Sequence, residues 1–426
     1  MEIPKHQQKL STEQAAILEE VKKGTSVFFT GSAGTGKSFL LRRIIKAMKD
    51  KYGSEAVAVT ASTGLAATHI GGITLNSFAG IFTSSEVAKK PANDFVNTRW
   101  VQTRALVIDE VSMIDAPLFD KVSTLGSTAR NRQEPFGGIQ LIVTGDFFQL
   151  PPVKHDQYAF NSKAWRKASL RSFNLKQVFR QRDPEFIAML NDIRVGLLTD
   201  RYIQILSDEC AAPVAYADAI EPTHLYPVNR QVNAENDQRL LRLELPEHHF
   251  TAHDYGSDEV LKHLLCPKFL RLRKGAQVMR VKTKTAELVN GVVGVVVGFQ
   301  EDLSGPDRVL PIVEYSLMSG RKIVETVEWD KWERSDGRST ASRTQIPLCL
   351  AWALSIHKSQ GQTIDRVRVD LNKIFAPGLQ GKCQTYVALS RATCLEQLEV
   401  LNFTPQKVKV NMDVVNWTKT LERIDI

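Results

Sequence analysis

The chain lacks several features that would assign it to a specialised class of protein. Only five of its 426 residues are cysteine, and no two of them form a C-x-x-C pair. We therefore expect reduced, structural thiols in an intracellular compartment, and neither a disulfide framework nor a zinc site. No apolar run approaches the ~20 residues of a membrane span, and the first ten residues lack the apolar core of a signal peptide. We expect no membrane partner.

Acidic residues are in the minority. Lys and Arg number 55 against 47 Asp and Glu, which gives a net charge of +8 at pH 7. This balance favours a polyanionic partner, nucleic acid first, although an ordinary basic enzyme would show the same excess. The hydrophobic share of 43% is typical of a globular protein. At this length we expect about two to four domains.

One stretch between an apolar run and a helical pattern carries nucleotide chemistry. Residues 31–38 match the phosphate-binding consensus GxxxxGK[ST] over their whole length. Glycines let backbone N–H groups approach phosphates, and the start of the following helix adds positive charge. Lys37 is expected to reach the β- and γ-phosphates of ATP, and Ser38 to hold Mg²⁺. The residues of this loop expected to bind ATP are Gly31, Ser32, Ala33, Gly34, Thr35, Gly36, Lys37 and Ser38.

Apolar runs that alternate with helical patterns predict the fold class. Four short β-branched or aromatic runs indicate buried strands, at 27–30, 56–60, 105–108 and 141–144. Because near-continuous apolar strands separated by helices form parallel sheets covered on both faces, we expect an α/β fold.

Two segments interrupt this alternation and suggest domain boundaries. The polar stretch at about 83–100 predicts a small insertion, and the short β-rich runs within 274–345 predict an inserted β-barrel. We therefore predict a first α/β domain over 1–168. A second one is expected over 169–273 and 346–426, on either side of the barrel.

Acidic and amide side chains follow two of the predicted strands. Asp109 and Glu110 come directly after the strand at 105–108, as in the Walker-B arrangement. Asp109 is expected to bind Mg²⁺ through water, and Glu110 to orient and deprotonate the attacking water. Gln149, in the sequence GDFFQLPP, is a candidate to contact both the γ-phosphate and that water. A glutamine on an ordinary loop is the alternative.

Two arginines in the second half of the chain distinguish a motor from a switch. Arg180 and Arg391 lie in the sequences VFRQ and ALSRA. Arginines that reach across a cleft would neutralise transition-state charge and raise the rate by ~10³-fold or more. Hydrolysis would then depend on domain closure, which is the physical basis of translocation. A surface salt bridge is the alternative for each arginine.

Small, hydroxylated and basic residues indicate contact with nucleic acid. The residues expected to bind DNA are Thr60, Ser62, Thr63, Phe78, His357 and Lys358. The first three open a strand-to-helix turn whose hydroxyl and N–H groups suit DNA phosphates. Phe78 offers a stacking face, with core packing as its alternative. Gln360 and Gly361, next to the basic pair, are expected to face the nucleotide.

Taken in order, these segments resemble the motifs of the Pif-type (petite integration frequency) DNA helicases of superfamily one. Gln14 in LSTEQ is similar to the adenine-reading Q motif, GSAGTGKS to motif I, and VIDEVSMID to motif II. The further segments that resemble family motifs are 60–81 (Ia), GDFFQLPPV (III), 175–183 (IV), 355–363 (V) and 386–393 (VI). The matches extend over nearly the whole chain.

The resemblance implies two RecA-like domains, a small wedge insertion in the first and a Src-homology-three-like barrel in the second. It also implies 5′-to-3′ unwinding driven by ATP and Mg²⁺, acting on single-stranded, tailed or structured DNA, by a monomer. Roles at replication forks, telomeres, G-quadruplexes and mitochondrial DNA are known in the family, together with repair and recombination. They imply a location in the nucleus or the mitochondrion.

Three alternatives stay open at this point. A related RecD-like or mobile-element helicase would show the same motif order. An ATP-gated DNA-binding remodeller would hydrolyse ATP without separating strands. A nucleotide kinase or small-molecule ATPase would not respond to single-stranded DNA.

Overall fold

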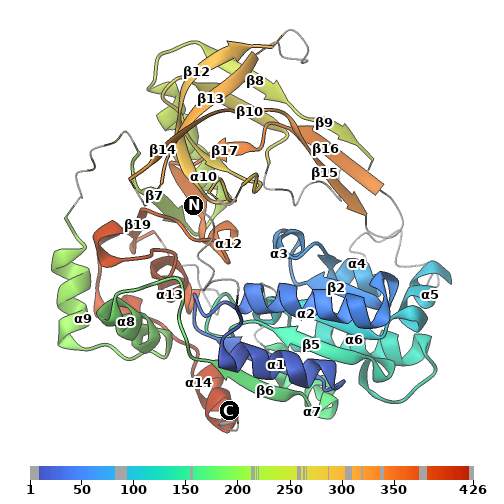
Figure 1. Cartoon of the computed structure of the whole chain (residues 1–426). Helices are drawn as coiled ribbons and strands as arrows, with labels where there is room; N and C mark the ends of the chain where they lie inside the picture. Colours follow the sequence, from blue (N-terminus) through green and yellow to red (C-terminus); the bar gives the residue numbers. More distant parts are fainter. Residues whose placement is uncertain are drawn as a thin grey trace.

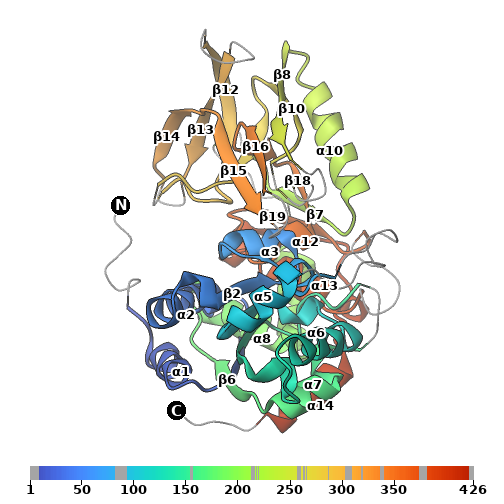
Figure 2. The same ribbon diagram turned by 90° about the vertical axis from the view of Figure 1, so that its right-hand side faces the viewer.

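The structure, a computed structural model, describes residues 9–81, 94–153, 157–212, 216, 218, 220–256, 261, 264, 266–285, 287–302, 309–317, 320–335, 340–373 and 381–421. Its elements form two parallel-sheet lobes and an antiparallel β domain that sits above both of them (Figures 1 and 2). All five cysteines are free thiols, as expected. Within the described ranges, no helix is long and apolar enough to cross a membrane.

Lobe 1 is built on a sheet with the strand order β3-β2-β4-β5-β1-β6, in which every pair is parallel. Its strands are β1 (Val27–Gly31), β2 (Val57–Ala61), β3 (Ile73–Thr74), β4 (Ala105–Asp109), β5 (Gln140–Thr144) and β6 (Arg171–Leu175). Its helices are α1 (Thr12–Lys22), α2 (Lys37–Tyr52), α3 (Gly64–His69), α4 (Leu75–Ala79), α5 (Asp94–Gln102), α6 (Ala116–Ala129) and α7 (Lys163–Ala168). Both faces of the sheet are covered, because Phe29 packs against α1 and α2 while Phe28 faces the helices on the other side. The α/β prediction is confirmed here.

Lobe 1 extends further along the chain than the sequence predicts. The predicted boundary at 168 is wrong, because β6 pairs with β1 from Arg171 to Leu175. The prediction also assigns the C-terminal helix to the second domain, yet α14 (Met412–Thr420) packs on lobe 1. The Trp417 ring stacks on Phe160 with ring centroids 4.4 Å apart. The apolar face of α14 is buried against aromatic side chains of lobe 1, and sequence order does not reveal that destination.

The predicted insertion at 83–100 is only partly visible. Residues 82–93 lie outside the described residues, whereas α5 belongs to the core of lobe 1. Val96 and Trp100 are buried there, and the Trp100 ring packs edge-on against Phe78 at 4.6 Å. The part of the insertion that α5 covers is therefore structural support for lobe 1.

Lobe 2 has a smaller parallel sheet with the order β18-β7-β19-β20. Its strands are β7 (Thr223–Tyr226), β18 (Ala353–Ser355), β19 (Val367–Asp370) and β20 (Leu398–Leu401). Its helices are α8 (Pro184–Arg194), α9 (Asp200–Gln204), α10 (Asn229–Leu241), α12 (Ile356–Ser359) and α13 (Gln384–Leu389). Residues 176–183 connect the two lobes. The second α/β domain is thus confirmed, with the β domain inserted between β7 and β18.

The β domain consists of antiparallel sheets. Most of its buried side chains form an apolar core of their own, and others, such as Trp332 and Ala341, join the core of lobe 2. Its strands are β8 (Glu247–Thr251), β9 (His253–Tyr255), β10 (Phe269–Arg273), β11 (Gln277–Arg280), β12 (Val293–Glu301), β13 (Val309–Ser316), β14 (Lys322–Thr326), β15 (Asp330–Ser335), β16 (Thr340–Gln345) and β17 (Leu348–Leu350). The predicted limits of 274–345 are too narrow. β8 and β10 pair with each other before residue 274, and β17 pairs with β11 after residue 345.

Candidate active site between the two lobes

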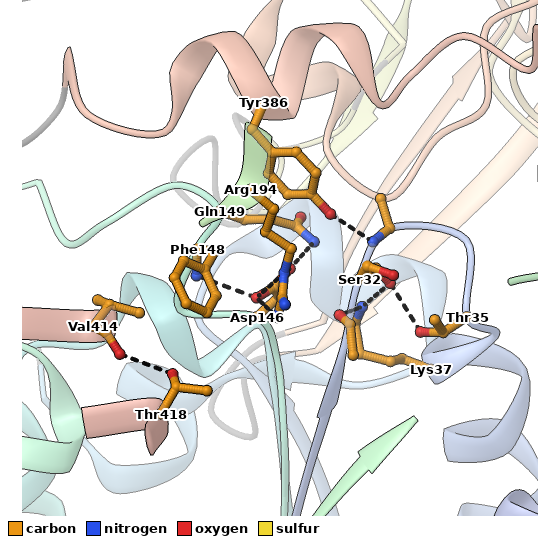
Figure 3. Close-up of polar contacts among 12 residues, drawn as sticks. Ser32, Thr35, Lys37, Asp146, Phe148, Gln149, Arg194, Tyr386, Val414 and Thr418 are labelled. Carbon is orange, nitrogen blue, oxygen red and sulfur yellow. Dashed lines mark hydrogen bonds and ion pairs between the residues drawn. The ribbon is translucent and has the colours of Figure 1, made fainter. Parts of the chain in front are cut away.

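The phosphate-binding loop connects β1 to α2 in the predicted way. Gly34 and Gly36 have φ values of +88° and +78°, in the left-handed region that favours glycine. No side chain caps the start of α2, so its first N–H groups remain suited to an anion. The ammonium of Lys37 donates to the carbonyl of Gly31 at 2.7 Å and to that of Ser32 at 3.1 Å (Figure 3).

Gln14 supports this loop from α1. Its backbone and side chain form a capping box with Ser11, and its amide nitrogen lies 3.4 Å from the carbonyl oxygen of Thr35. Phe179 lies beside it: a Cβ on Gly36 would be 2.8 Å from the Gln14 amide nitrogen and 3.5 Å from the Phe179 ring. Phe179 is 43% exposed, so its ring can offer a face to a base. Sequence reasoning missed this residue, although it adjoins Arg180.

The acidic pair lies at the end of β4, next to the loop. The pKa of Asp109 is raised to about 8, mainly because the carboxyl group is buried and also because the charge of Glu110 repels it. Burial also raises the pKa of Glu110, while the charges of Lys37 and Arg391 oppose that rise. The amide of Gln360, from lobe 2, donates to the Glu110 carboxylate at 2.8 Å. Glu110 is therefore held across the cleft by the residue that the sequence predicted to face the nucleotide.

Gln149 points inward and is bound by its own loop. Its amide nitrogen donates to the carboxylate of Asp146 at 3.2 Å, and both side chains are buried. Arg194, at the end of α8, donates to the same carboxylate at 2.7 Å (Figure 3). The sequence analysis did not identify Asp146 or Arg194. The position of Asp146 directly after an apolar strand was the available signal.

Both predicted finger arginines lie at the cleft. Arg180 packs closely on the phosphate-binding loop. If Gly34 had a Cβ atom, that atom would lie only 2.8 Å from the Cβ of Arg180. Burial, with repulsion from Arg391, lowers the pKa of Arg180 to about 9. Arg391 is 1% exposed and donates to the carbonyl of Ser359 at 3.2 Å. In this structure the donors of Arg391 thus bind atoms of its own lobe.

Further hydrogen bonds join motif segments across the cleft. The backbone N–H of Ala33, inside the phosphate-binding loop, donates to the hydroxyl of Tyr386 on α13 at 2.8 Å. The amide of Gln181, in the connector, donates to the carbonyl of Ala392 at 2.9 Å. Sequence reasoning also missed Tyr386, because nothing in the sequence YVALSRAT shows which side chain faces lobe 1.

A cavity of about 940 Å³ lies between the two lobes and the β domain. Many of the predicted site residues line it together: Ser38, Thr63, Asp109, Glu110, His357, Lys358, Gln360 and Gly361. One continuous space is therefore open both to the residues expected to bind nucleotide and to several of those expected to bind DNA. At the edge of this cavity, the Nδ2 atom of Asn290 in the β domain lies 3.3 Å from the Nε2 atom of His69 in lobe 1.

Three of the predicted DNA contacts are not in this cavity. The Thr60 hydroxyl is buried in the sheet and donates to the carbonyl of Val107 at 2.6 Å. Phe78 is 1% exposed and packs in the core, so its predicted stacking role is wrong. Ser62 holds the end of β4 through its N–H, which donates to the Asp109 carbonyl at 3.1 Å. Local sequence does not show which of these side chains turns toward the core.

Comparison with known proteins agrees with this arrangement. The family model for PIF1-like helicases matches residues 9–202. A crystal structure of Pif1 helicase from Candida albicans is 41% identical, covers 97% of this chain and 100% of that one, and superposes with a TM-score of 0.79. The chain belongs to the PIF1-like helicase family.

Two further PIF1-like helicases bear on function. The ATP-dependent DNA helicase PIF1 of Emericella nidulans is 42% identical over 94% of this chain. The chain spans 61% of that relative's length, less than two thirds, as for the other curated relatives at the head of the comparison. A structure of Bacteroides Pif1 bound to single-stranded DNA is 28% identical, covers 96% of each chain and has a TM-score of 0.65.

Proposed function

We propose that this chain is the motor of an ATP-dependent DNA helicase that moves 5′ to 3′ along single-stranded DNA. The observation that carries the proposal is the cleft, where Arg180 of the connector and Tyr386 of lobe 2 lie against the phosphate-binding loop of lobe 1. Arg391 of lobe 2 lies close enough for its charge to act on Glu110 and Arg180. The Bacteroides relative bound to single-stranded DNA supports the choice of DNA as the track.

The residues of lobe 1 suit ATP and Mg²⁺. The hydroxyl of Ser38 and the carboxylate of Asp109 line the same cavity, and oxygen ligands of this kind are what Mg²⁺ prefers. When bound, the ion would neutralise charge on the phosphates. Lys37 would move from the carbonyls of Gly31 and Ser32 to the β- and γ-phosphates, a short displacement of a flexible side chain.

The protein groups divide the hydrolysis step between them. Glu110 orients the attacking water and takes its proton. The Gln360 amide fixes the direction in which that carboxylate points. Arg180 and Arg391 stabilise the charge that builds up on the transferred phosphate. Because Gln360 and Arg391 come from lobe 2, hydrolysis requires the lobes to be closed.

DNA is expected to enter the same cavity from the side of His357 and Lys358. Both residues line it, and Lys358 is exposed, so its ammonium can pair with a backbone phosphate. The side chain of Thr63 caps the start of α3, so this residue lies at the strand-to-helix turn. The backbone N–H groups of this turn suit DNA phosphates. The active site is completed within one chain, which supports a monomer as the working unit.

Duplexes with tails of opposite polarity test the proposal. We expect strand displacement from a 5′-tailed duplex with ATP and Mg²⁺, and none from the matched 3′-tailed duplex. Single-stranded DNA should also raise the rate of ATP hydrolysis. Equal unwinding of both substrates would contradict the polarity, and hydrolysis that ignores DNA would contradict the motor.

The second candidate, an ATP-gated DNA-binding remodeller, is favoured by the short insertion. The part of the predicted insertion at 83–100 that lies in α5 packs into lobe 1 and is therefore not available as a wedge that separates strands. Residues 83–93 of the predicted insertion lie outside the described residues. A single-turnover displacement assay with a trap for free enzyme distinguishes the two candidates. A remodeller would hydrolyse ATP in response to DNA and release no displaced strand. The genome-maintenance roles and the nuclear or mitochondrial location stay predictions from the family.

A further inference from the structure

A buried ion pair joins the two lobes behind the phosphate-binding loop. Asp146 follows β5 in lobe 1, and Arg194 ends α8, whose side chains Phe186 and Ile193 pack in the core of lobe 2. The guanidinium donates from Nη2 to Oδ1 at 2.7 Å and from Nε to Oδ2 at 3.0 Å. The exposed fractions of the two side chains are 0% for Asp146 and 12% for Arg194. Such two-point geometry fixes both distance and orientation.

The same carboxylate shapes the loop that carries Gln149. Asp146 also accepts the N–H of Phe148 at 3.2 Å and the side-chain amide of Gln149 at 3.2 Å (Figure 3). The guanidinium of Arg194 lies 4.3 Å from the centre of the Phe148 ring. The guanidinium of Arg194 therefore contacts Asp146 and the Phe148 ring of this lobe 1 loop, and through Asp146 it also fixes Gln149.

Charge in the cleft gives this pair a second consequence. Burial acts to raise the pKa of Asp146, but the charge and hydrogen bonds of Arg194 outweigh it and hold the pKa below its ordinary value. Lys37 is the next cation that attracts this carboxylate. Without Arg194, a buried carboxylate would be left facing Lys37, which ATP needs free for its phosphates.

We propose that Arg194 is a positioning residue of the motor, one that acts through Asp146 to set the place of Gln149 and to keep Lys37 available. A contact between Gln149 and the γ-phosphate is then transmitted through the ion pair to α8, and so to lobe 2. This inference rests on the proposed function, because it assumes that ATP occupies the phosphate-binding loop. Asp146 and Arg194 do not touch the reacting atoms in this account.

Replacing the two charged groups by neutral amides, singly and together, separates positioning from simple charge balance. R194Q should raise the KM for ATP and lower kcat, because the freed Asp146 competes for Lys37. In D146N/R194Q the KM should return to within about threefold of wild type, since no carboxylate remains. The kcat in saturating single-stranded DNA should stay at least about tenfold low, the effect of losing one charged hydrogen-bond pair.

The matched control is R201Q. Arg201 is a half-exposed arginine that pairs with Glu185 at the start of α8, and its loss should leave both constants unchanged. Recovery of both KM and kcat in D146N/R194Q would overturn the inference and leave a structural ion pair. Should R194Q fail to fold, R194K keeps the charge but not the two-point geometry. It should show a normal KM with a reduced kcat, and a wild-type kcat would overturn the inference.

Hydrogen exchange provides a readout that does not depend on unwinding. In wild type, a non-hydrolysable ATP analogue should protect amides of the phosphate-binding loop and also those of α8. In D146N/R194Q the loop should remain protected while α8 loses its response. Protection of the wild-type loop without any response of α8 would overturn this inference and leave the proposed function standing. Absence of protection in the loop itself would overturn both.

Discussion

The two lobes share a parallel-sheet design but contribute opposite charges to the cleft. Lobe 1 brings the phosphate-binding loop and the acids Asp109, Glu110 and Asp146, whereas Arg194 and Arg391 come from lobe 2. Within the described part of lobe 2, no glycine-rich loop like that of residues 31–38 precedes a helix. In the proposed function, this difference means that lobe 1 binds the nucleotide and that lobe 2 supplies the groups that complete the site. Under that proposal, hydrolysis depends on the position of one lobe relative to the other.

The largest effect is expected from a substitution that removes the phosphate-binding lysine of lobe 1. Lys37→Ala should lower ATP hydrolysis by at least about 10²–10³-fold, because a preorganised charge on the transferred phosphate is lost. Binding of single-stranded DNA should change little, since Lys37 is not among the residues that line the shared cavity. Lys46→Ala on the exposed side of α2 is the matched control. Substantial hydrolysis by the Lys37 variant would mean that lobe 1 does not bind the triphosphate as proposed.

The next effect removes the contribution of lobe 2. Arg391→Ala should lower kcat about 10²-fold or more while the KM for ATP changes little, as for arginines that act on transition-state charge. Arg391→Lys keeps a cation but loses the fork that holds the carbonyl of Ser359, and it should recover only part of the rate. Arg182, exposed in the connector, provides the control Arg182→Ala. An unchanged kcat in Arg391→Ala would show that lobe 2 does not contribute to hydrolysis through this arginine.

The core of lobe 2 contains a buried histidine that should make the folded protein less stable in acid. His224 is buried in β7 of lobe 2, and the centre of its ring lies 4.2 Å from that of the Tyr226 ring. Burial lowers the pKa of His224 to about 4. The unfolded chain takes up the proton at about pH 6.5, so this group destabilises the folded state progressively as pH falls from 6.5 toward 4. Between pH 6.5 and 5 the loss should be about 2 kcal/mol.

Urea unfolding at these two pH values measures that loss. His224→Phe keeps an aromatic ring and removes the titrating group, so its unfolding midpoint should fall less between pH 6.5 and 5 than that of wild type. His249→Phe, at an exposed position on β8, should retain the full acid sensitivity. An equal fall of the unfolding midpoint in wild type and His224→Phe would show that His224 does not cause the loss of stability in acid.

The sequence predicts best where chemistry is contiguous. The phosphate-binding loop and the acidic pair each need only a few consecutive residues after a strand, and both lie where expected. The local motifs of Arg180 and Arg391 are easily recognised, and both residues lie at the cleft, whereas their action on the phosphate stays a prediction. Gln360 reaches Glu110, as the prediction that it faces the nucleotide cleft implies.

The rest depends on contacts between segments that are distant in sequence. Phe78 and Thr60 were expected at DNA, but packing against Trp100 and a bond to Val107 decide their direction. Arg194 carries no local motif, and only the docking of α8 brings it to Asp146. The domain limits were wrong for the same reason, since β6 and α14 join lobe 1 through pairing and packing that periodicity does not encode.

The smallest expected effect concerns a single hydroxyl that joins the lobes. Tyr386→Phe removes the acceptor of the Ala33 N–H, and one such bond contributes about 1 kcal/mol, or about fivefold in an opening equilibrium. Because this bond connects the lobes, hydrogen exchange should speed up at the phosphate-binding loop and remain unchanged in the β-sheet of either lobe. Tyr216→Phe is the matched control, since the buried Tyr216 hydroxyl has no hydrogen-bond partner among the described residues. Equal exchange at Ala33 in wild type and Tyr386→Phe would show that α13 and the loop are not coupled by this contact, and that closure depends on the charged groups alone.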